Sequence, residues 1–534
     1  MWTRVPHLPL PWHGVILLTI LTEEPALTQS VLIIGAGIAG LSAGCYAQMN
    51  GYRSQILELH TIPGGLCTSW RRGDYVFDGS VRYLTGTTPQ SKVHQLWDEL
   101  GVLHGRPIHN YDEFIRFEGT DGRTFVLYTD IARLEQHMLA LAPQDHHLIR
   151  EFAEALRQFT QMDMPVDITP SDPLEVLDLG KGMLPVLWPV LRWRTVTVRQ
   201  FAARFQDPLL REALPQFFQF SPPDFPMMLL LTTLPMMNDR EAGYPIGGSL
   251  LFAQDIAGRY LALGGEIRYR ARVTQVLVED NRAVGVRLED GSELRADTVI
   301  SAADGRTTIF DLLEGRYLNH TIRTYYRDLP AAQSILQISL GIARDFSREP
   351  PALSFPLQRP VVLGNVRQER LVLKHYCFDP TMAPPGKSVL SLWCEADYDH
   401  WKSLRADRKQ YRAAKEQVAQ QVIALLDERY PGLRAQIEEV DVATPVTYER
   451  YTGNWRGAFA GWALTTRKMS MMMGGGMSKA LPGLGSFYMI GQWVEPGGNV
   501  ELSAASGRDV VKDICGLEGK PFRTGIAEEG QPSR

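Results

Sequence analysis

A strand, a glycine-rich turn and a helix follow one another near the start of the chain, and no other feature limits the fold as strongly. Residues 31–34, Val-Leu-Ile-Ile, form an unbroken apolar run that is typical of a strand buried in a parallel sheet. They lead into Gly-Ala-Gly-Ile-Ala-Gly at 35–40, a G-x-G-x-x-G pattern, and then into small, helix-compatible residues at 41–47. This order predicts a nucleotide-binding turn in which backbone N–H groups at the helix N-terminus hold phosphates. The predicted contacts of this turn are Gly35, Gly37, Ile38, Ala39 and Gly40.

An acidic residue and a second glycine pair indicate which nucleotide binds. Glu58 ends a predicted strand at 54–58, where its carboxylate can accept a hydrogen bond from a ribose hydroxyl. Pro63-Gly64-Gly65 follows, and in flavoproteins of the two-dinucleotide-binding type such a pair lets the chain pass against the FAD diphosphate. No second G-x-G-x-x-G and no C-x-x-C or C-x4-C pair occurs downstream. We therefore expect one dinucleotide, FAD, with neither a separate NADPH site nor a redox disulfide.

The composition excludes several other classes of protein. The net charge of −5, with no block of lysine or arginine, argues against a nucleic-acid partner. The five cysteines are scattered, so we expect no disulfide framework, no metal site and a reducing, cytoplasmic location. The H-E-x-x-H, G-x-S-x-G and P-loop patterns are absent, which leaves no basis for a metalloprotease, a hydrolase or an NTPase.

The chain has 534 residues, which exceeds one ordinary core, and its alternating strand and helix signals predict an α/β protein of two interleaved domains. One is a Rossmann-type FAD-binding domain built from three segments, and the other is a substrate domain with a mixed sheet and a helical subdomain. The apolar run at 15–21 is too short to span a bilayer, and it is either part of an unstructured extension or the core of a weak signal peptide. The predicted boundaries are 1–29 for the N-terminal extension, 30–110, 240–310 and 470–517 for the FAD-binding domain, 111–239 and 311–469 for the substrate domain, and 518–534 for the C-terminal tail.

Beyond the first turn, the chain carries longer motifs of one family. They are YVFDGSVRYLTG at 75–86, YPIGGSL at 244–250, the segments 379–392 and 444–461, and MIGQWVEPGGNVELSAASGRDVV at 489–511. Together with the first turn, Glu58 and the glycine pair, they resemble the FAD-dependent phytoene desaturase, carotenoid isomerase and retinol saturase group of the amine-oxidase-like flavoproteins. The resemblance extends from about residue 30 to residue 517, which is nearly the whole chain.

In that family the last strand, turn and helix close the flavin site. The resemblance implies that Gly491 lies near the diphosphate and that Gly498 and Asn499 bring backbone under the isoalloxazine. It also implies that the helix from Val500 aims its N-terminus at the pyrimidine edge, where reduction places negative charge. No cysteine or histidine lies beside the turn at 491–499, so we expect the FAD to be bound without a covalent bond. The further cofactor contacts that the resemblance implies are Gly64, Gly65, Leu66 and Val273.

The resemblance also implies a reaction: hydride transfer from an apolar polyene or isoprenoid-like substrate, in a desaturase, saturase or isomerase. Asp78, Arg82 and Tyr83 follow the glycine pair and are the catalytic candidates. Arg82 stands where saturase-like members tend to have histidine. Leu66 stands where amine oxidases usually carry arginine, and this difference counts against the amine oxidase branch of the superfamily. Two alternatives stay open. One is an amine oxidase, with Lys479 as the lysine near the flavin N5, and the other is a flavin-binding protein without catalysis.

Two segments combine apolar and aromatic residues with nearby arginines, a pattern typical of contact with a membrane surface. They are MLPVLWPVLRWRTVTVR at 183–199 and FPMMLLLTTLPMM at 225–237. An apolar polyene is almost insoluble in water, so we expect peripheral membrane contact at these segments. Nine of the 17 methionines fall within 227–237 and 469–477, and flexible thioethers suit a channel for a long apolar substrate.

Overall fold

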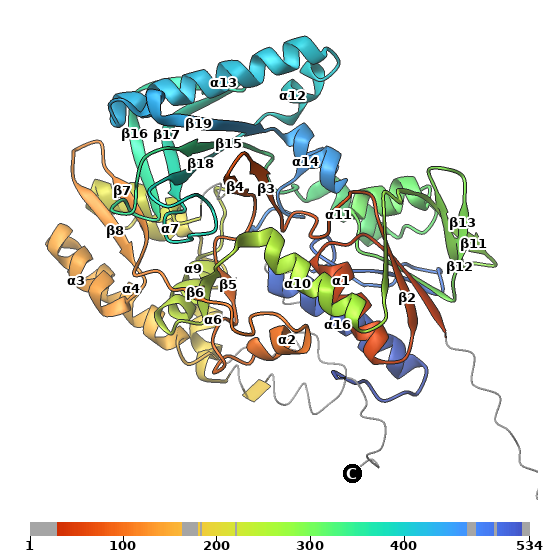
Figure 1. Cartoon of the computed structure of the whole chain (residues 1–534). Helices are drawn as coiled ribbons and strands as arrows, with labels where there is room; N and C mark the ends of the chain where they lie inside the picture. Colours follow the sequence, from red (N-terminus) through yellow and green to blue (C-terminus); the bar gives the residue numbers. More distant parts are fainter. Residues whose placement is uncertain are drawn as a thin grey trace, which may run out of the picture.

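The computed structural model describes residues 29–162, 180–181, 184–218, 222–466, 477–495 and 499–525. Figure 1 shows that these residues form two main sheets with helices packed around them. Some of the sequence predictions lie outside the described residues. They are the N-terminal extension apart from Gln29, Met183, the methionines at 469–473, Gly498, and the C-terminal tail from residue 526.

A five-stranded parallel sheet is built from three distant parts of the chain. Its central strand is β1, in which Leu32 is in register with Gln55 on one side and Val299 on the other. In order across the sheet, the strands are β10 (Glu266–Tyr269), β2 (Arg53–Glu58), β1 (Ser30–Ile34), β14 (Thr298–Ser301) and β20 (Phe487–Met489). This is the strand order of a doubly wound nucleotide-binding sheet, and it confirms the predicted α/β fold class.

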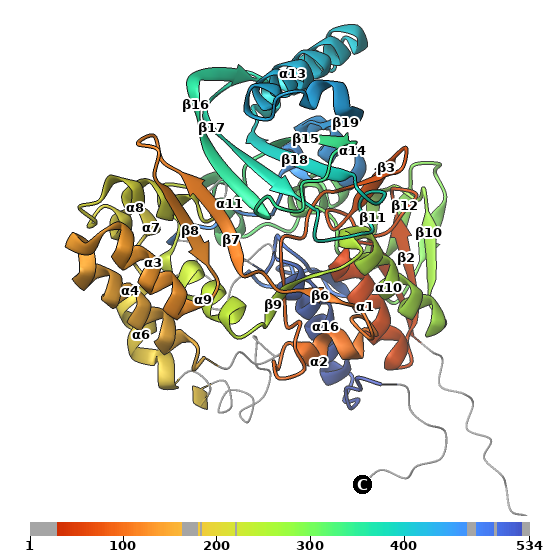
Figure 2. The ribbon, with the colours of Figure 1, turned by 60° about the vertical axis from the view of Figure 1, so that its left-hand side comes forward.

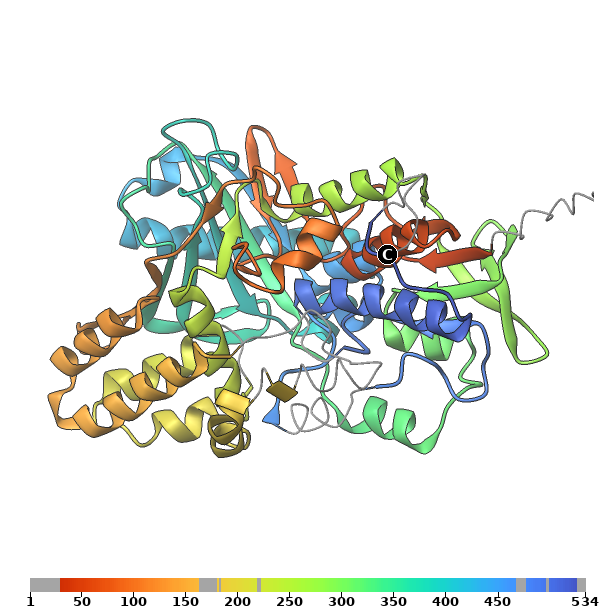
Figure 3. The same cartoon turned by 90° about the horizontal axis from the view of Figure 1, so that it is seen from below.

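Two separate apolar cores lie on the two faces of this sheet, which explains why β1 is apolar without interruption. Val31 and Ile33 pack against a layer of helices, whereas Leu32 and Ile34 pack against a small antiparallel sheet. The helices are α1 (Ile38–Met49), α10 (Gly248–Ala262) and α16 (Val500–Leu517), and the small sheet comprises β11 (Val273–Glu279), β12 (Arg282–Leu288) and β13 (Glu293–Arg295). Seen from below, in Figure 3, the first and last of these helices lie side by side.

A seven-stranded mixed sheet forms the second layer of the molecule. Its strands, in order, are β19 (Ile437–Ala443), β15 (Ile335–Ile342), β18 (Ser388–Glu395), β17 (Val366–His375), β16 (Ala352–Leu363), β7 (Glu113–Glu118) and β8 (Thr124–Tyr128). Leu336 and Leu340 of β15 point to one face, which α13 (Arg408–Arg429) covers with Val422 and Leu426. Figure 2 shows α13 against this sheet from the side. The buried Gln337 lies on the opposite face of the same strand.

A hairpin connects the two layers. It consists of β3 (Ser69–Arg72) and β4 (Tyr75–Asp78). Trp70 Nε1 donates to the Asp441 carboxylate at 3.1 Å, and Tyr75 OH donates to Glu438 at 2.7 Å, so both strands hold the edge of the seven-stranded sheet. The remaining short strands are β5 (Leu84–Thr85), β6 (Ile108–His109) and β9 (Ala242–Pro245). The remaining α-helices named by the structure are α2 (His94–Glu99), α3 (Ile131–Leu141), α4 (His146–Phe159), α6 (Leu187–Trp193), α7 (Val198–Ala202), α8 (Pro208–Ala213), α9 (Met227–Asn238), α11 (His320–Asp328), α12 (Tyr398–Leu404) and α14 (Pro445–Thr452).

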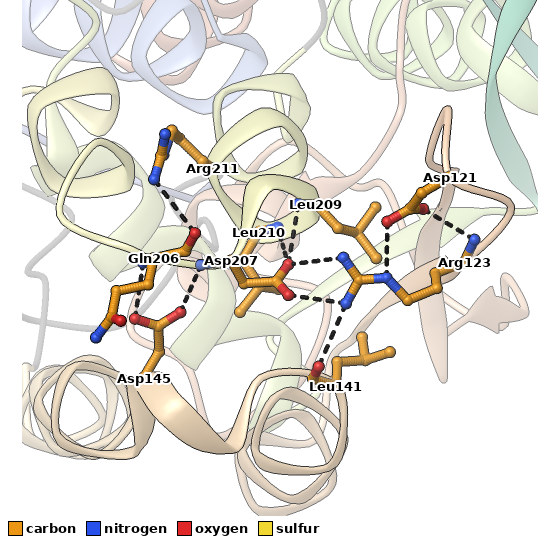
Figure 4. A network of polar contacts seen from close by, with 9 residues as sticks. All are labelled: Asp121, Arg123, Leu141, Asp145, Gln206, Asp207, Leu209, Leu210 and Arg211. Carbon is orange, nitrogen blue, oxygen red and sulfur yellow. Dashed lines mark hydrogen bonds and ion pairs between the residues drawn. The ribbon is translucent and has the colours of Figure 1, made fainter.

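A group of helices, α3, α4 and α6 to α9, is fixed to the seven-stranded sheet by a polar network (Figure 4). Arg123, in the turn between β7 and β8, donates to the Asp207 carboxylate at 2.8 Å. The same carboxylate caps α8 by accepting the Leu209 N–H at 2.9 Å. Asp145 accepts the backbone N–H groups of Gln206 and Asp207, both at 2.8 Å. These bonds join the hairpin turn to the start of α8 and to the start of α4, where Asp145 lies.

The segment 225–237 belongs to the core of this helical group, and the prediction that it contacts a membrane is wrong. Leu230, Leu231 and Leu234 of α9 have no exposed surface, and Met227 is equally buried. The helix is apolar on all sides, and such a helix fits a protein interior as well as a membrane surface. The sequence could not separate the two environments. The first methionine stretch therefore fills a core, where a substrate channel was predicted.

The contact between α1 and α16 brings the two glycine-containing turns of the chain together. Ser42 Oγ donates to the Ala504 carbonyl at 2.7 Å, across the helix pair. A Cβ on Gly507 would lie 2.4 Å from the Ala39 carbonyl oxygen, so the helices approach as closely as only a glycine permits. Just before α16, the Gly491 N–H donates to Ser506 Oγ at 2.8 Å, which ties the last turn to the same helix.

Replacement of Gly507 by alanine should separate these helices and destabilise the protein. The added Cβ would meet backbone atoms of α1 that cannot move aside, and such overpacking costs about 1–3 kcal/mol. Gly516→Ala is the matched control, because it lies on the same helix and its Cβ would meet nothing within 4 Å. We expect Gly507→Ala to lower the melting temperature and Gly516→Ala to leave it unchanged or raise it. Equal melting temperatures for the two variants would contradict the close approach.

Candidate active site

A cavity of about 1150 Å³ lies between the two layers. Pockets for drug-sized ligands measure about 300–1,000 Å³, so this one has room for a dinucleotide and part of a second molecule. Its walls include the first glycine turn and Glu58 on the nucleotide side, and Trp393 and Phe225 on the side of the seven-stranded sheet and the helical group. Of the predicted cofactor contacts, the cavity is lined by Gly35, Gly37, Ile38, Ala39, Glu58, Gly64, Gly65, Leu66, Val273, Gly491, Asn499 and Val500.

The first turn has the shape that a diphosphate requires. Gly35 has a φ of +99°, which a residue with a side chain rarely adopts, and a Cβ on Gly40 would lie 2.0 Å from the Gly35 carbonyl oxygen. Gly40 therefore serves packing and does not line the cavity. A Cβ on Gly37 would meet no protein atom within 4 Å, although this residue begins α1 and lines the cavity. The open space at Gly37 is the cradle into which a phosphate fits.

Glu58 is held in the cavity wall by backbone donors. Its carboxylate accepts the Ala36 N–H at 2.6 Å and the His60 N–H at 2.8 Å, and the side chain is buried. Burial raises the pKa of Glu58, and the two N–H groups act in the opposite direction because they favour the carboxylate. Each carboxylate oxygen keeps a second lone pair, which can accept a ribose hydroxyl. The residues present at this end of the cavity fit the ribose and diphosphate of FAD.

The N-terminus of α16 forms another wall of the cavity. Asn499 caps the helix by accepting the Leu502 N–H at 3.3 Å, and its amide donates to the Glu501 carboxylate at 2.7 Å. Val500 and Glu501 line the cavity in the first turn of the helix. Burial raises the pKa of Glu501. A helix N-terminus carries a partial positive charge, so this wall favours negative charge on a bound ring.

The three catalytic candidates do not occupy equivalent places. Arg82 and Tyr83 line the cavity, and burial raises the pKa of Tyr83 to about 12. Asp78 is fully buried behind them and is not part of the cavity wall. Its carboxylate accepts the N–H and the hydroxyl of Ser249, both at 2.7 Å, and the Ser80 N–H at 3.0 Å. We therefore propose that Asp78 positions the loop that carries Arg82 and Tyr83.

Sequence reasoning missed the aromatic wall of the cavity. The Trp462 and Trp493 rings meet edge to face with centroids 5.0 Å apart, and the Trp393 and Phe459 rings do so at 4.8 Å. All four residues line the cavity, although they come from three separate parts of the chain. The only signal in the sequence was the position of three of them inside or next to the motifs at 444–461 and 489–511, namely Phe459, Trp462 and Trp493.

Lys479, the lysine that the amine oxidase alternative would place near the flavin, does not line the cavity. Its ammonium pairs with the carboxylates of Glu495 and Asp509, both at 3.2 Å. Lys479 thus joins the segment before α16 to the helix itself. The geometry gives this side chain a structural role.

The fold and the cavity together define a dinucleotide-binding flavoprotein. The family described as flavin containing amine oxidoreductase matches residues 38–515, and the chain belongs to this family. Two curated relatives align over most of both chains. Prolycopene isomerase of Arabidopsis thaliana is 24% identical, and the alignment covers 92% of this chain and 83% of the isomerase. The neurosporene-forming phytoene desaturase of Rhodobacter capsulatus is 26% identical, and the alignment covers 90% of this chain and 93% of the desaturase.

Solved structures share the fold. A triple mutant of putrescine oxidase superposes with a TM-score of 0.60 at 14% identity, over 92% of this chain and 99% of its own. An oxidoreductase from Methanosarcina mazei superposes with a TM-score of 0.58 at 16% identity, over 90% and 100%. The family membership confirms that the protein is an FAD-dependent oxidoreductase, as the sequence predicted.

Replacement of Gly37 by valine should abolish flavin binding without unfolding the protein. The side chain would enter open space at the start of α1, where we place the diphosphate, and it would meet no protein atom within 4 Å at its Cβ. Gly258→Val, on the exposed side of α10, also meets nothing and serves as the control. We expect purified Gly37→Val protein to be colourless and Gly258→Val protein to carry the wild-type amount of FAD. Full flavin content in Gly37→Val would show that the nucleotide turn has been misplaced.

Proposed function

We propose that this FAD-dependent oxidoreductase acts on an apolar polyene or isoprenoid-like substrate, as a desaturase, saturase or isomerase. The main support is the alignment, over about nine-tenths of the chain, with relatives whose names refer to prolycopene and phytoene. The cavity is compatible with such a substrate, because aromatic residues form part of its wall. Trp393, Trp462 and Trp493 are each at most 3% exposed to solvent.

The protein's own residues would orient the substrate and keep water out. Bound FAD supplies the hydride acceptor for this chemistry. The edge-to-face packing of Trp462 against Trp493 makes this part of the wall apolar and rigid, which helps to exclude water. The N–H groups at the start of α16 stabilise negative charge that develops on a neighbouring ring, by up to about 2 kcal/mol. Arg82 and Tyr83 also line the cavity, and their polar groups would help to position the substrate.

The substrate class can be tested by comparing a polyene with amines. We expect a C40 polyene in detergent micelles to change its absorption spectrum, or to bleach the flavin, when it is mixed with the protein under anaerobic conditions. Putrescine and benzylamine should release no hydrogen peroxide in air. Peroxide release from an amine, without any reaction of the polyene, would favour the amine oxidase alternative. A flavin that reacts with neither class and with no quinone would favour a non-catalytic flavin-binding protein.

An exposed apolar face on α6 supports peripheral membrane contact at the first of the two predicted segments. The exposed apolar side chains are Leu187 (48% exposed), Trp188 (78%) and Leu191 (42%) on α6, and Leu184 (65%) just before it. Met183 lies outside the described residues. The other face of α6 is buried in the helical group, which gives the helix the amphipathic character of an interfacial segment. Two exposed arginines, Arg194 and Arg199, follow α6 in the sequence. Within the residues that the structure describes, no helix is both long enough and apolar enough to cross a bilayer.

Replacement of Trp188 by aspartate should weaken binding to lipid vesicles. We expect the wild-type protein to cosediment with anionic phosphatidylserine-containing liposomes, and salt to reduce the bound fraction because the arginines contribute by charge. Leu517→Asp is the control, since Leu517 is 77% exposed at the far end of α16. Recovery of all three proteins in the liposome-free supernatant would remove the membrane proposal.

A further inference from the structure

Two cationic side chains, the half-buried Arg82 and the buried Lys374, lie close together at the edge of the main cavity. Arg82 lies in the loop after β4, and Lys374 lies on β17, where only 6% of the residue is exposed. Among the described residues, neither cation has a carboxylate within ion-pair distance, and the Lys374 ammonium has no hydrogen-bond partner. A buried charge without an ion-pair partner is expensive to maintain, so this pair calls for an explanation.

A small pocket of about 30 Å³ lies between these two side chains. Arg82 lines both this pocket and the main cavity, so this residue borders both spaces. The other walls are largely aromatic, and Phe114 lies under the Arg82 guanidinium at 5.3 Å. The hydroxyl of Tyr111 is already used, because it donates to the Arg82 carbonyl at 2.9 Å. The pocket therefore offers cationic donors and no anionic group of its own.

The nearby carboxylates are engaged elsewhere. The negative charge of Asp78 raises the pKa of Lys374. The carboxylate oxygens of Asp78, however, already accept the hydrogen bonds from Ser80 and Ser249 described above. The charge of Glu501 raises the pKa of Tyr83, and the Glu501 carboxylate accepts a hydrogen bond from the Asn499 amide. Burial lowers the pKa of Lys374 and the Arg82 charge lowers it further, whereas the Asp78 charge raises it. An anion bound beside both side chains would favour the charged form of the ammonium. The ammonium rests 3.3 Å from the centroid of the Trp393 ring, which lines the main cavity.

We propose that Arg82, with Lys374 behind it, binds a carboxylate at one end of the substrate. This inference rests on the proposed function, and it narrows the substrate to a long apolar chain that carries a terminal acid. The volume of the small pocket suits one carboxylate, whose two oxygens match the fork of a guanidinium. The aromatic rings around the pocket would contact the first carbons of the chain, and the rest would extend into the main cavity.

The proposal is tested by matched ligands that differ only in charge. The flavin-loaded protein is titrated with an all-trans C20 polyene carboxylate and with its methyl ester, and binding is followed by the perturbation of the flavin spectrum. We expect the wild type to bind the acid about 10- to 100-fold more tightly than the ester. Arg82→Gln should remove this preference, and Arg82→Lys should keep part of it. Lys374→Met should reduce the preference while leaving the affinity for the ester unchanged.

Arg450→Gln is the matched control. Arg450 is an exposed arginine that also lines the main cavity, so its loss should leave the preference for the acid intact. Equal affinities for acid and ester in the wild type would overturn the carboxylate site while leaving a polyene substrate in place. Failure of both ligands to bind would contradict the proposed function together with this site. A loss of FAD from Arg82→Gln would assign the arginine to the cofactor and would also overturn the proposal.

Discussion

The close packing of α1 against α16 is the contact on which the flavin site depends. The two helices begin at opposite ends of the chain, yet each presents its N-terminus to the same cavity. Gly507 lets the backbones approach, and the Ser42 hydroxyl bonds across the pair. The strand–turn–helix near the start of the chain holds the phosphates in our proposal, and the one near the end faces the ring. Each turn forms one part of the cavity wall, so together they enclose the space in which we place the dinucleotide.

The second layer of the molecule completes the cavity, and buried polar bonds fix it in place. Asp78 makes hydrogen bonds to both layers. Its carboxylate bonds to Ser249 at the start of α10, and its carbonyl accepts the Gln337 side chain of the seven-stranded sheet at 2.8 Å. The loop that carries Arg82 and Tyr83 is therefore anchored to both layers at once. Such anchoring is what a site needs when the cofactor performs the reaction and the protein supplies orientation.

Local sequence patterns predicted the nucleotide side of the site well, and long-range packing decided the rest. The first turn, the strand that ends in Glu58 and the helix from Val500 are each encoded in a few consecutive residues. The aromatic wall is not, because Trp393, Trp462 and Trp493 meet only after the two layers have packed. Burial was equally hard to predict: Leu230 and Trp188 lie in similar apolar stretches, and the first is in a core while the second is 78% exposed. The difference arises because α9 is surrounded by other helices, whereas α6 has only one face against them.

A crystal structure of the flavin-loaded protein tests most directly whether both ends of the chain form one site. We expect the FAD diphosphate within hydrogen-bond distance of the backbone N–H groups that follow Gly37, and a ribose hydroxyl on Glu58. The isoalloxazine should lie beside the N-terminus of α16, between Val500 and the aromatic wall. Electron density for a flavin whose ring points away from α16, or whose diphosphate does not touch the first turn, would contradict the assembly of a single site from these two turns.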